Sequence, residues 1–233
     1  DQTLDKLAIK SEEEASDLKK KLEAQDYYIA EASKKEVKRN PSAPFTTSTL
    51  QQEANRRLNF SAKQTMMIAQ KLYEGVELNG DSVGLITYMR TDSTNLSKKF
   101  SSEAADYIND KLGKEYLNSK EFKTKSKGAQ EAHEAIRPTS AFRSPESIKD
   151  SLNDQQFKLY QLIWQRAVAS QMSSAKLEAT SIDVNTKDDK YTFRVSGQVI
   201  KFDGFLKIYP TTTKDEILPE MEKDEKAKLI ALV

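Results

Sequence analysis

The sequence predicts an α+β fold, in which a β-rich domain formed by both ends of the chain carries an inserted, mostly helical domain. Two observations support this class. Apolar residues recur with the helical period of about 3.6 through the middle of the chain, and the period changes to about two after Ser174. Strand-like segments also precede Pro41 and Pro44, and these two prolines end the strand-like pattern of the first part of the chain. The expected parts are 1–47 (β-rich), 48–174 (helical) and 175–233 (β-rich, with a charged excursion near 211–225).

The first part is expected to fold as strand, helix and strand. Residues 4–9 are short and apolar-rich, and residues 27–32 are aromatic and β-branched, which favours a strand in both places. Between them, Ser11 is suited to cap a helix. Residues 12–14 of that helix are all Glu, and carboxylates are stabilised in a first turn by the helix dipole.

The middle of the chain is expected to be mostly helical. Thr49 with Gln52, and Ser61 with Gln64, fit capping boxes for two successive helices, the first of which runs to Leu58. The apolar face expected on the second helix comprises Ala62, Thr65, Met66, Ala69, Leu72 and Tyr73.

Beyond these helices, the sequence predicts a strand over 84–89 and a helix from near Ser101 to Leu112. A further helix over 153–172 has an apolar stripe that is typical of a core face. After it, alternating apolar residues predict a hairpin that turns at 187–190. Strand character continues through 198–210 and returns at 227–233.

Composition limits the class of protein. The chain has 233 residues and no cysteine, which excludes a disulfide framework and a thiolate metal site. Its longest apolar runs are far shorter than the ~20 residues of a membrane span, so we expect a soluble, cytoplasmic protein. The net charge is +1, but residues 31–71 carry eight Lys or Arg against three acids. This surplus allows a local anion-binding surface, and an unevenly charged solvated surface is the alternative.

One stretch combines an abrupt rise in polarity with residues that can do chemistry. In GLITYMRTDST (84–94), Tyr88 and Arg90 lie two residues apart, which places them on the same side of an extended backbone. A tyrosine hydroxyl becomes useful as a nucleophile when cations stabilise the phenoxide, and a guanidinium can grip a phosphate by two hydrogen bonds. The pair would therefore suit attack on a phosphodiester. The alternative is that Tyr88 is an ordinary half-buried packing residue.

The single histidine lies in EAHEAIRPTS (131–140). The zinc-protease motif H-E-x-x-H is excluded, because Arg137 occupies the position of its second histidine. His133 and Arg137 would instead share a helical face at i, i+4, where they suit an anion. The alternative is a surface helix turn that ends at Pro138.

The sequence lacks the motifs of several other functional classes. The seven glycines are dispersed and form no phosphate-cradling loop, and no Ser/His/Asp set stands out. Asp188 and Asp189 fall in the predicted hairpin turn with lysines, unlike a two-carboxylate Mg²⁺ site. We therefore expect this chain to supply no metal ligands. The chain begins at Asp1 without an initiator Met, and we expect it to be part of a longer protein.

Four stretches together resemble the type IA DNA topoisomerases. GLITYMRTDST resembles the active-site tyrosine motif of that family, and AQEAHEAIRPT (129–139) resembles its second signature. APFTTSTLQQEA (43–54) and LYQLIWQRAVASQM (159–172) match in the same order. Met89 after the tyrosine is more similar to the bacterial topoisomerase I group than to topoisomerase III, which usually has Pro there.

The resemblance implies a reaction and a set of site residues. Tyr88 would attack a phosphodiester of single-stranded DNA to give a 5′-phosphotyrosyl link and a free 3′-hydroxyl. Strand passage and religation would then relax negatively supercoiled DNA without ATP. Arg90 would hold the scissile phosphate, and His133 would support DNA binding. The other DNA- or phosphate-binding candidates are Arg137, Thr91, Asp92 and Ser93.

The resemblance also implies a winged-helix-like helical domain (domain III) inserted in a discontinuous β-rich arch (domain II), in a nucleoid-associated protein with no membrane role. The family's Toprim domain, which holds the required Mg²⁺, is not in this sequence, so the isolated chain is expected not to relax DNA. Two alternatives remain. One is a non-catalytic DNA-binding module in which Tyr88 only packs, and the other is a scaffold with no nucleic-acid role.

Overall fold

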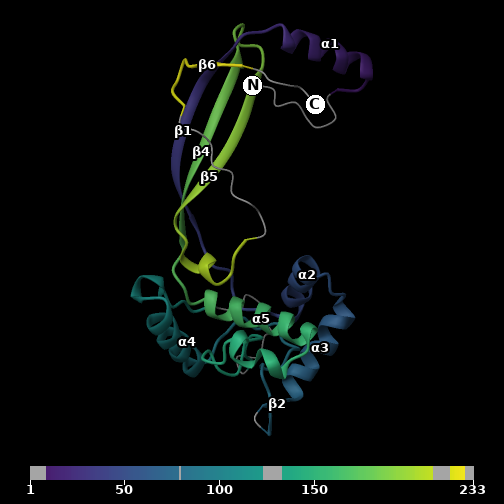
Figure 1. Ribbon diagram of the computed structural model, residues 1–233, viewed down its shortest axis with the longest axis vertical. Coiled ribbons are helices and arrows are strands. Elements are labelled where there is room, and N and C mark those ends of the chain that lie inside the picture. Colours follow the sequence, from purple (N-terminus) through teal and green to yellow (C-terminus); the bar gives the residue numbers. More distant parts are fainter. Residues whose placement is uncertain (1–8, 79, 123–132, 212–220, 229–233) are drawn as a thin grey trace. The chain divides into compact units, whose positions relative to one another are not determined.

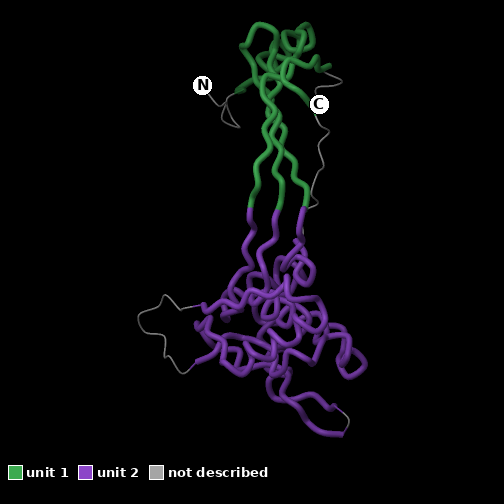
Figure 2. Tube along the Cα trace, turned by 90° about the vertical axis from the view of Figure 1, so that its left-hand side faces the viewer, with its two compact units in different colours: residues 1–37, 177–200, 215–233 green, residues 38–176, 201–214 purple. Residues whose placement is uncertain are grey.

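The computed structural model describes residues 9–78, 80–122, 133–211 and 221–228. Helices and an antiparallel sheet confirm the expected α+β class. The chain divides into two compact units (Figure 2): unit 1 comprises residues 1–37, 177–200 and 215–233, and unit 2 comprises 38–176 and 201–214. Residues 38–47 and 201–214, which the sequence placed with the β-rich ends, fall in unit 2. The winged-helix-like arrangement stays a prediction.

One sheet runs in the order β5-β4-β1-β6. Its long members β1 (Tyr27–Arg39), β4 (Ala175–Thr186) and β5 (Thr192–Phe202) lie side by side in Figure 1. The short β6 (Lys226–Ala227) pairs antiparallel with the start of β1. The hairpin between β4 and β5 turns at 187–190 as expected, with Asp189 at a φ of 56°. Of the strands expected over 4–9 and 227–233, residues 4–8 and 229–233 lie outside the described residues.

Helix α1 (Glu12–Glu23) begins as the sequence predicts. The Ser11 hydroxyl accepts a hydrogen bond from the Glu14 main-chain nitrogen at 3.2 Å, and residues 12–14 supply the acidic first turn. Close to the end of this helix, the Tyr27 hydroxyl donates to the Leu22 carbonyl at 2.6 Å, and both side chains are buried. The expected strand over 27–32 is therefore anchored at its first residue and continues to Arg39.

The described residues of unit 2 form four α-helices. They are α2 (Thr47–Leu58), α3 (Ala62–Glu74), α4 (Lys98–Lys111) and α5 (Asp154–Ala169). Helix α5 is the most buried of them, and it packs against both α2 and α3. Figure 1 shows it between that pair and α4, whose Ala104 meets Ala167 of α5 in a small apolar cluster. Short 3-10 turns η1 (Lys114–Tyr116), η2 (Pro145–Ser151) and η3 (Gly204–Lys207) complete the unit.

Two expectations about helix detail are wrong. The N-cap of α2 is Thr46, whose hydroxyl forms a reciprocal capping box with Thr49, so the predicted cap is in fact the third helical residue. Threonines at 46, 47 and 49 all fit a cap chemically, and the earliest of them is the N-cap. On α3, Tyr73 was expected on the apolar face but is 40% exposed, while Ile68 is buried in the centre of that face.

The expectation of a strand over 84–89 is also wrong. A short hairpin, β2 (Val76–Leu78) with β3 (Asp81–Val83), comes just before it. Within 84–89 only Ile86 forms an isolated bridge, and its partner is Pro138. Because proline has no N–H to donate, a regular ladder cannot continue there.

The expected strand over 198–210 ends at Phe202 instead. Gly204 has a φ of +51°, and a Cβ at that position would lie 2.6 Å from the Ser173 carbonyl oxygen. Glycine therefore lets the chain turn tightly against the start of β4.

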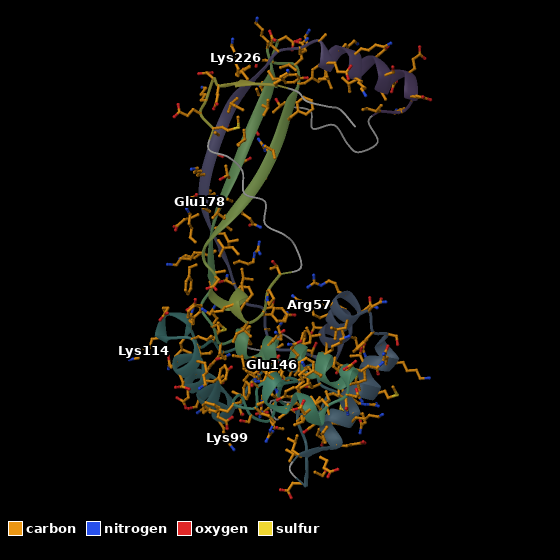
Figure 3. The ribbon with its side chains drawn as sticks, in the orientation of Figure 1. Arg57, Lys99, Lys114, Glu146, Glu178 and Lys226 are labelled. Carbon is orange, nitrogen blue, oxygen red and sulfur yellow. The ribbon has the colours of Figure 1, made fainter. Side chains whose placement is uncertain are left out.

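A charged cluster ties the segment after η3 to α2. Glu53 accepts hydrogen bonds from Arg57 Nε at 2.6 Å, from Arg56 Nη2 at 2.7 Å and from the Tyr209 hydroxyl at 2.6 Å. Arg57, labelled in Figure 3, also lies 4.1 Å above the Tyr209 ring and donates to the Pro210 carbonyl at 3.0 Å. Burial acts to raise the pKa of Glu53, but the hydrogen bonds from Arg56, Tyr209 and Arg57 outweigh it and lower that pKa to about 2.

This cluster predicts a pH dependence of stability. A carboxyl group whose pKa falls from 4.5 to about 2 on folding stabilises the fold above pH 4.5, and this contribution is lost as the pH falls toward 2. Glu53→Gln should therefore lower the free energy of unfolding by about 2–3 kcal/mol at pH 7. Its stability should also fall less steeply between pH 4.5 and 2, as measured by urea unfolding at several pH values.

Glu146→Gln is the matched control, because Glu146 is an exposed glutamate on η2. It should leave both the stability at neutral pH and the acid slope unchanged. An acid slope that is the same in the Glu53→Gln variant as in the unmodified chain would contradict a stabilising role for the ionised Glu53.

Candidate active site around Tyr88

Tyr88 lies on a segment that links β3 to α4 and is 50% exposed. Exposure alternates along this segment even though it forms no regular strand. The side chains of Tyr88, Arg90 and Asp92 are exposed, whereas those of Met89, Thr91 and Ser93 are buried. The period of two means that Tyr88 and Arg90 emerge from the same surface of the unit. The alternative, that Tyr88 is a half-buried packing residue, also fits a ring that is half exposed, so the role of Tyr88 stays a prediction.

The segment is held on one side by residues 135–139. The Thr87 main-chain nitrogen donates to the Arg137 carbonyl at 2.9 Å, and the Thr139 nitrogen donates to the Leu85 carbonyl at 2.9 Å. The Thr87 hydroxyl donates to the Ala135 carbonyl at 2.6 Å and accepts from the Arg137 nitrogen at 3.0 Å. These bonds flank Ile86, which is fully buried. The main chain just before Tyr88 is therefore fixed on both sides of Ile86.

The other side of the segment is held by the first residue of α2. The Thr47 nitrogen donates to the Thr91 carbonyl at 2.9 Å. The Thr47 hydroxyl donates to the Met89 carbonyl at 2.8 Å and accepts from the Thr91 nitrogen at 2.9 Å. One side chain thus spans the residues around Arg90. No sequence pattern singled out Thr47, although it lies in the TTSTLQQEA stretch that carried part of the resemblance.

The C-terminal end of α3 completes the surroundings of Tyr88. The Leu85 nitrogen donates to the Leu72 carbonyl at 2.8 Å. The ring of Tyr73 meets the ring of Tyr88 edge to face, with centroids 5.4 Å apart and planes at 63°. Tyr73 was assigned to the core face of its helix by sequence, so its place beside Tyr88 is a finding of the structure.

Thr91, Asp92 and Ser93 differ in what their side chains contact. The Thr91 hydroxyl accepts from the Ser93 nitrogen at 3.0 Å, and the Ser93 hydroxyl accepts from the Asn95 nitrogen at 3.1 Å. Both hydroxyls thus shape the bend that leads into α4. Asp92 alone of the three has an exposed side chain. Their predicted role in DNA binding stays a prediction.

The segment that contains His133 and Arg137 is not helical, so the expectation of a shared helical face is wrong. The alternative, a surface helix turn, is wrong too. The Ala135 nitrogen donates to the Asn95 carbonyl and the Ile136 nitrogen to the Phe45 carbonyl, each at 2.8 Å. Because these donors bond distant parts of the chain, they cannot form the i to i−4 bonds of a helix. His133 itself is exposed.

Arg137 is turned into the protein. Its guanidinium pairs with the Glu134 carboxylate, donates to the Ser97 hydroxyl at 3.2 Å and lies 4.8 Å above the Phe100 ring. Only 12% of its side chain is exposed. Ser97 is the N-cap of α4, so Arg137 joins the second signature stretch to the start of that helix. Its predicted phosphate contact stays a prediction, and these contacts show what the side chain does within the unit.

Among the described residues, no group of three or more His, Cys, Asp or Glu side chains is arranged to hold a metal ion. Asp188 and Asp189 serve the hairpin turn, where they accept hydrogen bonds from the Thr186 hydroxyl at 2.7 Å and the Tyr28 hydroxyl at 2.5 Å. Within the same described ranges, no helix is long and apolar enough to cross a membrane.

Comparison with known proteins identifies the family. A family model described as DNA topoisomerase matches residues 1–232. The chain belongs to this DNA topoisomerase family. DNA topoisomerase 1 of Rickettsia typhi and that of Rickettsia prowazekii are each 44% identical to it over 98% of the chain. The solved structure of full-length topoisomerase I from Thermotoga maritima superposes on 92% of the chain, with a TM-score of 0.79 and 41% sequence identity.

These matches confirm the resemblance to bacterial type IA topoisomerases. The chain spans 30% of the length of the Rickettsia topoisomerases and 34% of the Thermotoga topoisomerase chain. It therefore corresponds to about a third of the topoisomerases that it matches.

The hydrogen bonds that the Thr47 hydroxyl forms with Met89 and Thr91 predict a specific loss of stability when that hydroxyl is removed. Thr47→Val keeps the shape of the side chain but removes the hydroxyl, which leaves the Thr91 nitrogen and the Met89 carbonyl without that partner. We expect the free energy of unfolding to fall by about 1–3 kcal/mol, as measured by urea unfolding. Thr47→Ser retains the hydroxyl and is the control, with a loss of less than half that size. Equal losses in the two variants would show that the methyl group matters and the hydroxyl does not.

Proposed function

We propose that Tyr88 is the nucleophile of a type IA topoisomerase and that this chain is the tyrosine-bearing part of a larger enzyme that changes DNA topology. One observation carries the proposal. The tyrosine of the family motif is half exposed while its main chain is fixed on both sides by hydrogen bonds to distant segments. A fixed backbone with an accessible hydroxyl is what attack on a bound phosphodiester requires.

The proposed reaction conserves the energy of the phosphodiester. The Tyr88 oxygen forms a bond to phosphorus in single-stranded DNA, and the bond from phosphorus to the 3′ oxygen breaks. The phenol loses its proton, and the 3′ oxygen gains one to become a free hydroxyl. After a strand has passed through the gap, that hydroxyl attacks the phosphotyrosine and restores the original bonds. The cycle needs no ATP, because both steps exchange one phosphate ester for another.

Arg90 is proposed to hold the scissile phosphate. It emerges from the same surface as Tyr88, and its guanidinium can donate two hydrogen bonds to a phosphate and stabilise the charge that builds up in the transition state. His133, which is exposed, is proposed to support DNA binding near this pair. Arg137 would act through the segment that it anchors, since its guanidinium already contacts Glu134 and Ser97.

Magnesium does not fit the described residues, which bring no cluster of carboxylates together. We propose that the Mg²⁺ of the family is held by other domains of the full-length enzyme, and that this chain alone does not relax DNA.

The proposal is tested by Tyr88→Phe in the full-length enzyme. The variant should form no covalent adduct with a labelled single-stranded oligonucleotide, because the nucleophilic oxygen is gone. Its affinity for the oligonucleotide should change by less than about twofold, since the ring and the rest of the surface remain. Adduct formation is read on a denaturing gel and affinity by fluorescence anisotropy.

Tyr191→Phe is the matched control, because it removes a tyrosine hydroxyl at a position that lies in none of the four stretches that carry the family resemblance. It should form adduct like the unmodified enzyme. Adduct that persists in Tyr88→Phe would overturn the proposal and would favour the non-catalytic DNA-binding module instead.

A further inference from the structure

We propose that Tyr73 is a positioning residue for Tyr88, and that its ring fixes the direction in which the Tyr88 hydroxyl points. The inference rests on the proposed role of Tyr88 as nucleophile. It adds a residue outside the tyrosine motif, at the end of a helix whose sequence pattern predicted only a packing role.

The contact between the two rings has the geometry that aromatic pairs prefer. Their centroids are 5.4 Å apart and their planes meet at 63°, so the edge of one ring faces the other. The positive edge of an aromatic ring is attracted to the negative face of its neighbour, which makes this arrangement directional. Both rings remain partly exposed, at 40% for Tyr73 and 50% for Tyr88. The contact therefore orients Tyr88 without covering it.

The main chains that carry the two rings are held together independently of the rings. The Leu85 nitrogen bonds to the Leu72 carbonyl at 2.8 Å. Gly84 packs so closely on α3 that a Cβ there would lie 2.8 Å from the Tyr73 carbonyl oxygen. The lack of a side chain at Gly84 is thus what allows this approach. Because the backbones of residues 72–73 and 84–85 are in contact, the two rings are carried on main chains that lie side by side.

What remains free in Tyr88 is the side-chain torsion. Hydrogen bonds fix the backbone before and after it, but among the described residues none hydrogen-bonds to its hydroxyl. An exposed tyrosine can adopt about three staggered χ1 rotamers, and only one of them directs the hydroxyl to a given point. The Tyr73 ring favours one rotamer by direct contact. Loss of that ring should therefore lower the productive fraction of Tyr88 by roughly threefold, and by more if the freed ring also tilts.

The test compares Tyr73→Leu with Tyr73→Phe in the full-length enzyme. Leucine removes the aromatic ring, whereas phenylalanine keeps it and removes only the hydroxyl. Under single-turnover conditions with a labelled single-stranded oligonucleotide, Tyr73→Leu should form the covalent adduct about three- to tenfold more slowly. Tyr73→Phe should stay within about twofold of the unmodified enzyme. Met67→Leu, which alters an exposed side chain of the same helix, is the matched control and should not change the rate.

DNA affinity is measured separately in the Tyr88→Phe background, where no cleavage interferes. A positioning role predicts the same affinity with and without the added Tyr73→Leu substitution. A parallel loss of affinity would instead make Tyr73 a DNA contact and overturn the inference. Equal loss of rate in Tyr73→Phe and Tyr73→Leu would also overturn it, because the ring would then not be the active feature.

The contact between the two rings can also be measured without any substitution, which serves if the leucine variant is unstable. Nuclear Overhauser effects between the ring protons of Tyr73 and Tyr88 should be observed, and their absence would overturn the contact itself. The outcomes also separate this inference from the proposed function. If Tyr88→Phe abolishes the adduct while Tyr73→Leu is unaffected, only the positioning role fails.

Discussion

The exposure of Tyr88 depends on hydrogen bonds that the main chain around it makes with distant segments. Residues 85–87 bond to residues 135–139 on one side, and residues 89–91 bond to Thr47 on the other. These bonds allow Ile86 and Met89 to be buried immediately beside a half-exposed tyrosine. Without them, the segment would have unpaired polar groups next to buried side chains, which is costly. The bonds thus account for a rigid backbone in a segment that has no regular secondary structure.

The site is assembled from stretches that are far apart in sequence, and the helices of unit 2 bring them together. Helix α5 lies at the centre and packs against α2 and α3, so the start of α2 and the end of α3 are both placed by it. Arg137 adds the start of α4 through Ser97 and Phe100. Helices α2, α3 and α4 therefore each present one end to the segments around Tyr88.

Patterns within a single segment predicted much of this molecule, and contacts between segments account for most of the errors. The helices and the β4–β5 hairpin follow from periodicity and capping residues, and the exposure of Tyr88 and Arg90 agrees with their spacing of two. The stretch around His133 looks like a helix locally, but its donors bond Asn95 and Phe45, which no local pattern reveals. The contact of Tyr73 with Tyr88 likewise joins two segments, and the pattern of its own helix does not reveal it. The catalytic roles came from the family resemblance, since residue chemistry alone left the packing alternative open.

The central claim is that the side-chain oxygen of Tyr88, whose main chain is fixed by these hydrogen bonds, becomes the atom linked to DNA. Its most direct test is to trap the covalent adduct of the full-length enzyme, digest it with protease and nuclease, and locate the nucleotide by mass spectrometry. The account predicts a single modified peptide that contains Tyr88 with a phosphate ester on its phenol oxygen. A nucleotide on any other residue of the enzyme would contradict it.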